Sequence, residues 1–422
     1  MSFLVGAGGT PSPVRETITI VGALILAAVF VRRAAMERID RASLMFIALL
    51  PLLALVQLIP LPSTVWTALP LREAMSAGLG VSGAVDQWAP LSLDPLSTWW
   101  SLLSFVPPMV AFLMAASLDA PGRERTLLVV IALGAASAIL AGFQQLLGEA
   151  LFLHPRSIAA GASGFFANQN SQATFLAICV FGLAAMTARS GKVGTTPTIW
   201  ASLVAGLLAV GTLLSGSRMG FALFIVAALA ATCLLAMRRH ANIERRRSLA
   251  GRIGTAAALA MLTIALVFSD SFDHLLGRFA ETENGRLTTI WPDALLLAKE
   301  AWPAGTGIGT FVHVFGLVER LDVVDAAFAN RAHSDWLEFV IETGTAGVVV
   351  ALAMTAILFH RIWRDRSKTW DAPRLWALAA LGLIALHSLV DYPLRAIALS
   401  VVAALAASFL LLPPDEREAS HA

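Results

Sequence analysis

The chain is short of charge, of cysteine and of the acidic motifs that hold metal ions. Asp, Glu, Lys and Arg make up 14% of its 422 residues, whereas soluble globular chains carry roughly 25%. Its basic residues gather in short loops, which is typical of membrane topology rather than of a nucleic-acid-binding surface. The two cysteines, Cys179 and Cys233, fall in apolar runs. This predicts small core side chains, not a disulfide or a metal pair.

Metal-ligand motifs are missing as well. The sequence has no Asp-x-Asp, no His-Glu-x-x-His and no paired cysteines. Metal-assisted glycosyl or phosphoryl transfer needs carboxylate ligands placed together. We therefore expect chemistry that depends on arginine, with no metal and no cofactor.

Long apolar runs dominate what remains. Hydrophobic residues form 57% of the chain and the mean hydropathy is +0.75. The runs do not alternate at period two, so they favour membrane helices over a barrel. We predict one all-α polytopic membrane domain, residues 1–422, with about eleven spans of ordinary bilayer length. The predicted spans lie near residues 17–31, 42–61, 96–118, 126–147, 169–188, 197–214, 219–237, 253–269, 344–360, 375–391 and 394–412.

The short loops set the orientation. One alternate set of loops, which includes residues 238–252 and 361–374, is rich in arginine and lysine. By the positive-inside rule this set is cytoplasmic. The opposite face then carries one long loop, residues 269–343, between the eighth and ninth spans. In a Gram-negative bacterium that face is periplasmic. We expect the chemistry of the protein to take place in this loop.

Two arginines on that face suit a phosphate, because a guanidinium donates bidentately and stays charged. Arg218 lies in a Ser-Gly-Ser-Arg turn between two spans, and Arg286 opens an amphipathic segment of the long loop. Each also has an ordinary structural explanation. Arg218 can extend to the membrane interface as a span flank, and Arg286 can pair with Glu281 or Glu283 on a solvated surface.

His333 is the candidate general base. Ser334 is typical of a helix N-cap and Asp335 of a first helical turn. The positive end of the helix dipole would keep the imidazole neutral and able to accept a hydroxyl proton. The alternative is a histidine that only hydrogen-bonds to structure. Asp335, Glu338 and Glu342 share one helical face, where they can orient His333, pair with arginines or face water.

Two further segments have structural interpretations. Residues 305–309 are glycine-rich, but no Gly-Lys-Ser/Thr follows, so we predict a tight turn that folds the loop back on the membrane domain. His387 and Asp391 are one helical turn apart near the outer end of a span. They form either a buried pair that braces the site or a proton pathway.

Taken in order, the motifs of the outer face resemble the O-antigen ligase and O-antigen polymerase superfamily. The resemblance is densest between Gly164 and Leu394, and Ser334 departs from it, because relatives often have asparagine there. The motifs are residues 90–95 (PLSLDP), 164–170 (GFFANQN), 215–218 (SGSR), Arg286 with Trp291, 303–309 (PAGTGIG), 333–338 (HSDWLE) with Gly344, and 387–394 (HSLVDYPL).

The resemblance implies a GT-C-like glycosyltransferase of the bacterial inner membrane, with its active site facing the periplasm. Such enzymes transfer a glycan from undecaprenyl diphosphate to a hydroxyl of a lipid A core or of a second lipid-linked glycan. It further implies that Arg218 and Arg286 bind the diphosphate and that His333 is catalytic. Asn170, Asp335, Glu338 and Asp391 are possible supporting residues. Membrane lipids, and no nucleic acid, are the other expected partners.

The tryptophans of the loop, Trp291 and Trp336, can stack on sugar rings or anchor at the interface. Two readings from other classes remain: a flippase of lipid-linked sugars and a non-catalytic scaffold of a polysaccharide machine. A flippase should show repeats and charges at mid-membrane, whereas the charges here gather at one face. A scaffold does not require Arg218, Arg286 and His333 to converge.

Overall fold

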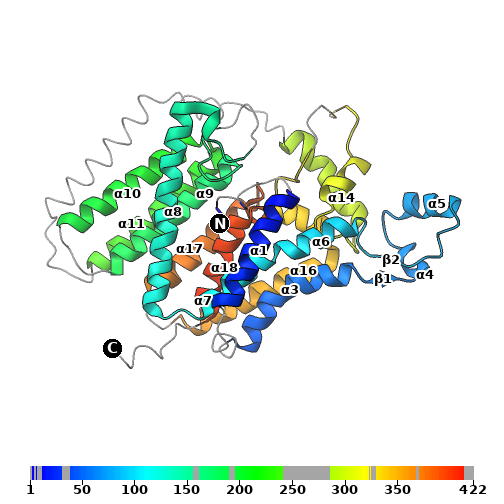
Figure 1. Cartoon of the computed structure of the whole chain (residues 1–422), viewed down its shortest axis with the longest axis horizontal. Helices are drawn as coiled ribbons and strands as arrows, with labels where there is room; N and C mark the ends of the chain where they lie inside the picture. Colours follow the sequence, from blue (N-terminus) through cyan, green and yellow to red (C-terminus); the bar gives the residue numbers. More distant parts are fainter. Residues whose placement is uncertain are drawn as a thin grey trace.

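The computed structural model describes residues 2–3, 6, 12–30, 39–154, 161–189, 195–240, 286–322, 324, 329–366 and 370–412. The predicted span 253–269 lies outside these residues. The elements of the described part are α1 (Pro13–Phe30), α3 (Arg41–Gln57), β1 (Pro60–Leu61), α4 (Ser63–Trp66), α5 (Glu73–Val81), β2 (Ala89–Pro90), α6 (Pro95–Ser104), α7 (Val106–Ala116), α8 (Ala120–Leu147), η1 (Gly148–Leu151), α9 (Gln169–Arg189), α10 (Thr195–Leu214), α11 (Arg218–His240), η2 (Arg286–Ile290), α14 (Trp291–Ala301), α15 (Phe311–Val314), η3 (Phe315–Leu317), α16 (Asp335–Arg364), α17 (Ala372–His387), η4 (Pro393–Arg395) and α18 (Ile397–Leu411) (Figure 1).

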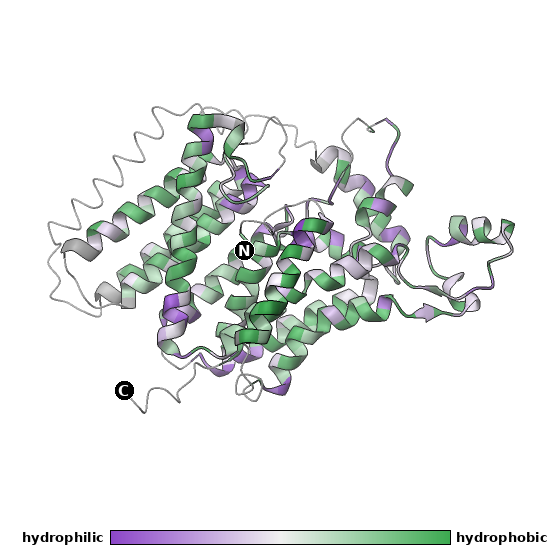
Figure 2. Ribbon diagram, viewed as in Figure 1, coloured by the Kyte–Doolittle hydropathy of each residue, from purple (hydrophilic) through white to green (hydrophobic). Residues whose placement is uncertain are grey.

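Apolar helices make up most of the described part. Five of its helices are long and apolar enough to cross a membrane, and four shorter helices are also apolar. Figure 2 shows hydrophobic residues along almost all of these helices. The protein is therefore a multi-pass membrane protein. Each predicted span other than 253–269 falls on a described helix, although 96–118 divides into α6 and α7, with prolines opening each part.

The main core surrounds α9, most of whose side chains are buried. Helices α8, α10, α11 and α17 pack against it, and small residues bring them close. A Cβ at Gly134 of α8 would overlap Cys179 of α9. Cys179 is buried, as predicted, but Cys233 is exposed on α11. The prediction for Cys233 was wrong because an apolar run in a membrane helix fills a lipid-facing side as readily as a core-facing one.

Helix α16 is broken near its N-terminal end. Gly344 has φ 55° and ψ −145°, outside the helical region, so residues 335–343 form a separate short helix before the span. The glycine-rich segment fills this break: Gly307 N donates to Glu342 O (2.8 Å) and Thr345 N donates to Pro303 O (2.9 Å). The predicted fold-back of residues 305–309 is thus observed.

The side chain of Gln57, at the end of α3, bridges α16 and the glycine-rich segment at the same break. It donates to Glu342 O and accepts from Ile308 N, both at 2.9 Å. The turn before α6 also contacts this region, since Leu93 N donates to Thr306 O (2.8 Å). Asp94 caps α6 by accepting from Leu96 N and Ser97 N. These bonds give the N-terminal end of α16 a fixed backbone.

Candidate functional site

His333 lies immediately before α16, in a backbone conformation that is rare for its residue type. Its φ is +51°, which costs free energy unless neighbouring bonds hold it. Ser334 caps the helix by accepting from Leu337 N (3.2 Å), as predicted, and donates to Ser388 O. Asp335 N donates to Asp391 O (3.0 Å). The chain on the C-terminal side of His333 is therefore fixed to the turn that follows α17.

Asp391 is the buried residue that faces His333. The two side chains are 1% and 14% exposed, and His333 Nδ1 lies 3.5 Å from Asp391 Oδ1. The same oxygen accepts from Tyr392 N (3.0 Å), and the rings of His333 and Tyr392 are 5.1 Å apart. A carboxylate only accepts hydrogen bonds, so the ring proton of neutral His333 belongs on Nδ1. Nε2 then carries the lone pair that can accept a proton.

The second oxygen of Asp391 faces a different group of donors. Asn168 Nδ2 (3.3 Å) and Asn170 Nδ2 both donate to Oδ2. Nε2 of the fully buried His387 lies 3.5 Å away, and its Nδ1 pairs with Thr174 Oγ1 at 2.8 Å. The structure brings His387 and Asp391 together, as both the bracing and the proton-pathway interpretations require.

Asn170 extends this network to the Ser-Gly-Ser-Arg turn. Its Oδ1 accepts from Ser217 Oγ (2.6 Å), and Ser217 Oγ accepts from Gly220 N (2.9 Å). Asn170 therefore uses both ends of its amide, one toward Ser217 and one toward Asp391. Arg218, the half-buried first residue of α11, follows Ser217 directly. The structure thus joins the arginine turn to His333 through two side chains.

Arg286 is the first residue of η2, a π-helical turn that leads into α14. The expected amphipathic helix is therefore present. The side chain of Arg286 lies outside the described part, so its approach to His333 stays a prediction. Trp291 follows as the first residue of α14, half-buried. Trp336 is 43% exposed and its Nε1 donates to Ala385 O (3.3 Å).

Asp335 and Glu338 were expected to support His333, but within the described residues neither hydrogen-bonds to the imidazole. Asp335 turns toward η4, where it accepts from Leu394 N (3.0 Å) and Ser388 Oγ (2.8 Å). Glu338 accepts from Arg331 and, through its other oxygen, from Ala332 N, both at 3.0 Å. Their support is indirect, because both hold backbone near His333 rather than its ring. Glu338 does so through the amide of Ala332, the residue before His333.

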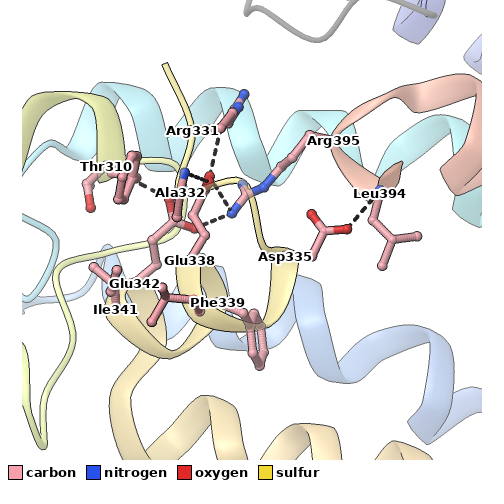
Figure 3. Close-up of polar contacts among 12 residues, drawn as sticks. Thr310, Arg331, Ala332, Asp335, Glu338, Phe339, Ile341, Glu342, Leu394 and Arg395 are labelled. Carbon is pink, nitrogen blue, oxygen red and sulfur yellow. Dashed lines mark hydrogen bonds and ion pairs between the residues drawn. The ribbon is translucent and has the colours of Figure 1, made fainter. Parts of the chain in front are cut away.

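Arg395 is a site residue that the sequence did not single out. Its NH2 lies 3.0 Å from Glu338 Oε1 and 2.7 Å from Glu342 Oε2, and both carboxylate side chains are 0% exposed. Figure 3 shows Arg395 and Arg331 converging on Glu338 from two sides, with Asp335 beside Leu394. Burial lowers the pKa of Arg395, but the neighbouring carboxylates raise it by more than burial lowers it. The net effect is a raised pKa.

This ion cluster fixes η4 to residues 335–343, the short helix at the start of α16. Glu342 also accepts from Phe311 N (3.3 Å), which ties α15 to the same group. A sequence signal did exist: Arg395 follows the last outer motif directly. Its partners could not be foreseen, because they lie more than fifty residues away. Within the part of the chain that the structure describes, no three His, Cys, Asp or Glu side chains group as metal ligands would.

The comparison with known families bears on this geometry. Residues 201–352 match the family model described as O-Antigen ligase. This match supports a resemblance to the O-antigen ligase and polymerase superfamily. The family match indicates a ligase- or polymerase-type enzyme of polysaccharide assembly. The O-antigen ligase segment contains Arg218, Arg286 and His333, whereas Asn170 and Asp391 lie outside it. Among curated proteins, no sequence matches the chain.

Proposed function

We propose that this protein transfers a glycan from undecaprenyl diphosphate to an acceptor hydroxyl at the periplasmic face of the inner membrane. The observation that carries the proposal is the pair of His333 and Asp391. Its 3.5 Å approach leaves Nε2 of a partly exposed, neutral imidazole as a proton acceptor. The match of residues 201–352 to the O-antigen ligase family supports the substrate class, since that family implies lipid-linked glycan substrates.

The proposed reaction is a single displacement. The acceptor hydroxyl gives its proton to His333 Nε2 while its oxygen forms a bond to the anomeric carbon of the donor. The bond from that carbon to the diphosphate breaks, and the leaving diphosphate keeps the electron pair. Asp391 stabilises the imidazolium that forms, as a buried carboxylate does for a histidine base.

Arg218 and Arg286 are assigned to the leaving group. Their charge offsets the negative charge that grows on the diphosphate in the transition state. Support for Arg218 comes from Ser217 and Asn170, which connect its turn to Asp391. A diphosphate at Arg218 would therefore lie on the same hydrogen-bonded framework as the base. Because the donor lipid is already activated, the proposed reaction uses neither a nucleotide nor a metal.

The acceptor defines two forms of the same activity. A ligase passes the glycan to a lipid A core, and a polymerase passes it to a second lipid-linked repeat. The test is reconstitution of the purified protein in proteoliposomes with the lipid-linked repeat, with and without lipid A core, resolved on a gel. A ladder formed from the repeat alone identifies a polymerase, and a shift of the lipid A core band identifies a ligase.

A matched variant makes that test specific. His333→Ala should lower the rate of formation of both products at least about a hundredfold, without lowering the yield of folded protein. If neither product forms, while a known active relative works under the same conditions, the glycosyltransferase proposal is wrong. The scaffold or flippase reading would then take its place.

A further inference from the structure

Arg320, between η3 and α16, joins two elements that precede it in the chain. Its Nε donates to Asp293 Oδ1 (2.8 Å), in the first turn of α14. Its NH2 donates to Thr288 O (2.9 Å), in η2. The backbone N of Arg320 also donates to the second oxygen of Asp293 (3.1 Å). One loop residue therefore holds both sides of the junction at which η2 meets α14.

Asp293 anchors Arg320 to a helix that is itself packed in place. It is 2% exposed, and both of its oxygens accept hydrogen bonds from Arg320. The next residue of α14, Ala294, belongs to the buried apolar cluster that also contains Ala332, the residue before His333. Helix α14 thus packs with the chain that carries the candidate base, and Arg320 connects η2 to this helix.

Pro292 removes a hydrogen bond that an α-helical course would give to η2. In an α-helix the carbonyl of residue 288 accepts from the amide of residue 292, but residue 292 is a proline and has no N–H. Residues 286–290 form a π-helical turn instead, a rare turn that occurs often at functional sites. Arg320 NH2 gives Thr288 O a hydrogen bond that Pro292 cannot give.

We infer that Arg320 is a positioning residue for Arg286. The inference rests on the proposed function, in which Arg286 offsets the charge of the leaving diphosphate. Thr288 follows Arg286 by two residues within the same turn, so the hydrogen bond to its carbonyl fixes the backbone from which Arg286 extends. Nε and NH2 of Arg320 are engaged by Asp293 and Thr288. Its role is therefore to hold this turn rather than to bind the substrate.

The test is a double-variant cycle on the full chain in proteoliposomes, with the undecaprenyl-diphosphate-linked repeat as donor and the acceptor that the unaltered protein uses. Arg320→Ala should lower kcat/KM about ten- to a hundredfold, because a misplacement of about 1 Å can cost up to that factor in rate. In a protein that already carries Arg286→Ala, the same change should lower kcat/KM by less than about twofold, since no guanidinium is left to misplace.

Two further variants separate positioning from folding. Lys299→Ala removes a positive charge from the exposed last turn of α14 and should leave kcat/KM unchanged. Arg320→Lys keeps a positive charge beside Asp293, but an ammonium cannot reproduce the planar fork that donates to Asp293 and Thr288 together. It should therefore lower kcat/KM while its unfolding midpoint stays at that of the unaltered protein. Where Arg320→Ala yields too little folded protein, Arg320→Lys takes its place in the cycle.

An equal loss from the Arg320 change with and without Arg286 would show a purely structural contribution and overturn the inference. Unaltered transfer in every Arg320 variant would overturn it as well. If Arg286→Ala left transfer unchanged, the role of Arg286 in the proposed function would be wrong, and the inference would fall with it.

A binding measurement separates the inference from a failure of the proposed function. If the unaltered protein transferred no glycan, that function would be wrong, and the affinity of the same four proteins for undecaprenyl diphosphate in nanodiscs would decide the inference. Arg320→Ala should weaken this binding only where Arg286 is present. Equal weakening in both backgrounds, or none in either, would overturn it.

Discussion

Replacement of Arg395 by methionine should destabilise the protein by about 3 kcal/mol. The variant leaves Glu338 with Arg331 and Ala332 N, but among the described residues Glu342 keeps only backbone amides, those of Phe311 (3.3 Å) and Gly309. Removing one partner of a buried ion pair costs about 3–5 kcal/mol, since the remaining charge stays desolvated. We expect the lower end of that range, because the Arg395 side chain is itself 19% exposed.

The assay is chemical unfolding of the purified protein in mixed detergent micelles. Arg364→Met is the control: its side chain is 51% exposed and pairs with Asp365 at 3.5 Å, and exposed pairs contribute about 0–1 kcal/mol. The double variant Arg395→Met with Glu342→Gln should recover part of the loss, since it removes the unpaired carboxylate. Equal costs for Arg395→Met and Arg364→Met would refute the argument.

Two further predictions concern the backbone and the pH dependence of stability. Gly344→Ala should lower the free energy of unfolding by at least about 1–3 kcal/mol, because φ is +55° and the new Cβ would overlap Pro303 O. The control is Gly382→Ala, in open space within α17, which should be neutral or stabilising by up to about 1 kcal/mol. Equal unfolding midpoints for the two variants would contradict this prediction. Burial, followed by the charge of Arg15, lowers the pKa of His154 below its ordinary 6.5. The unfolded chain therefore binds this proton at higher pH than the folded one, and stability should fall as the pH drops below about 6.5. His154→Gln should remove that fall, and parallel unfolding profiles of both proteins from about pH 7 to 5 would contradict it.

Much of the fold follows from local patterns in the sequence. Apolar runs predicted the described membrane helices, since a helix must satisfy its own backbone in lipid. Ser334 was predicted as an N-cap because its side chain competes for backbone donors at a helix start. His387 and Asp391 were predicted as a pair because positions four apart share a helix face.

The rest of the site depends on contacts between distant segments. Nothing in its neighbourhood shows that Arg395 would lie between Glu338 and Glu342. The same holds for Asp335, whose place in the first helical turn suggested support for His333. In the structure its carboxylate faces η4 instead. The positive φ of His333 is also a tertiary effect, imposed by bonds on the residues beside it.

The most direct test of the central claim is the initial rate of glycan transfer in proteoliposomes by the unaltered protein, Asp391→Asn, His333→Ala and the double variant. A positioned general base contributes about a hundred- to ten-thousand-fold to a rate. Each single variant should fall within that range, and the double variant should fall no further than His333→Ala, because the two residues act as one unit. Full transfer after His333→Ala would contradict the account.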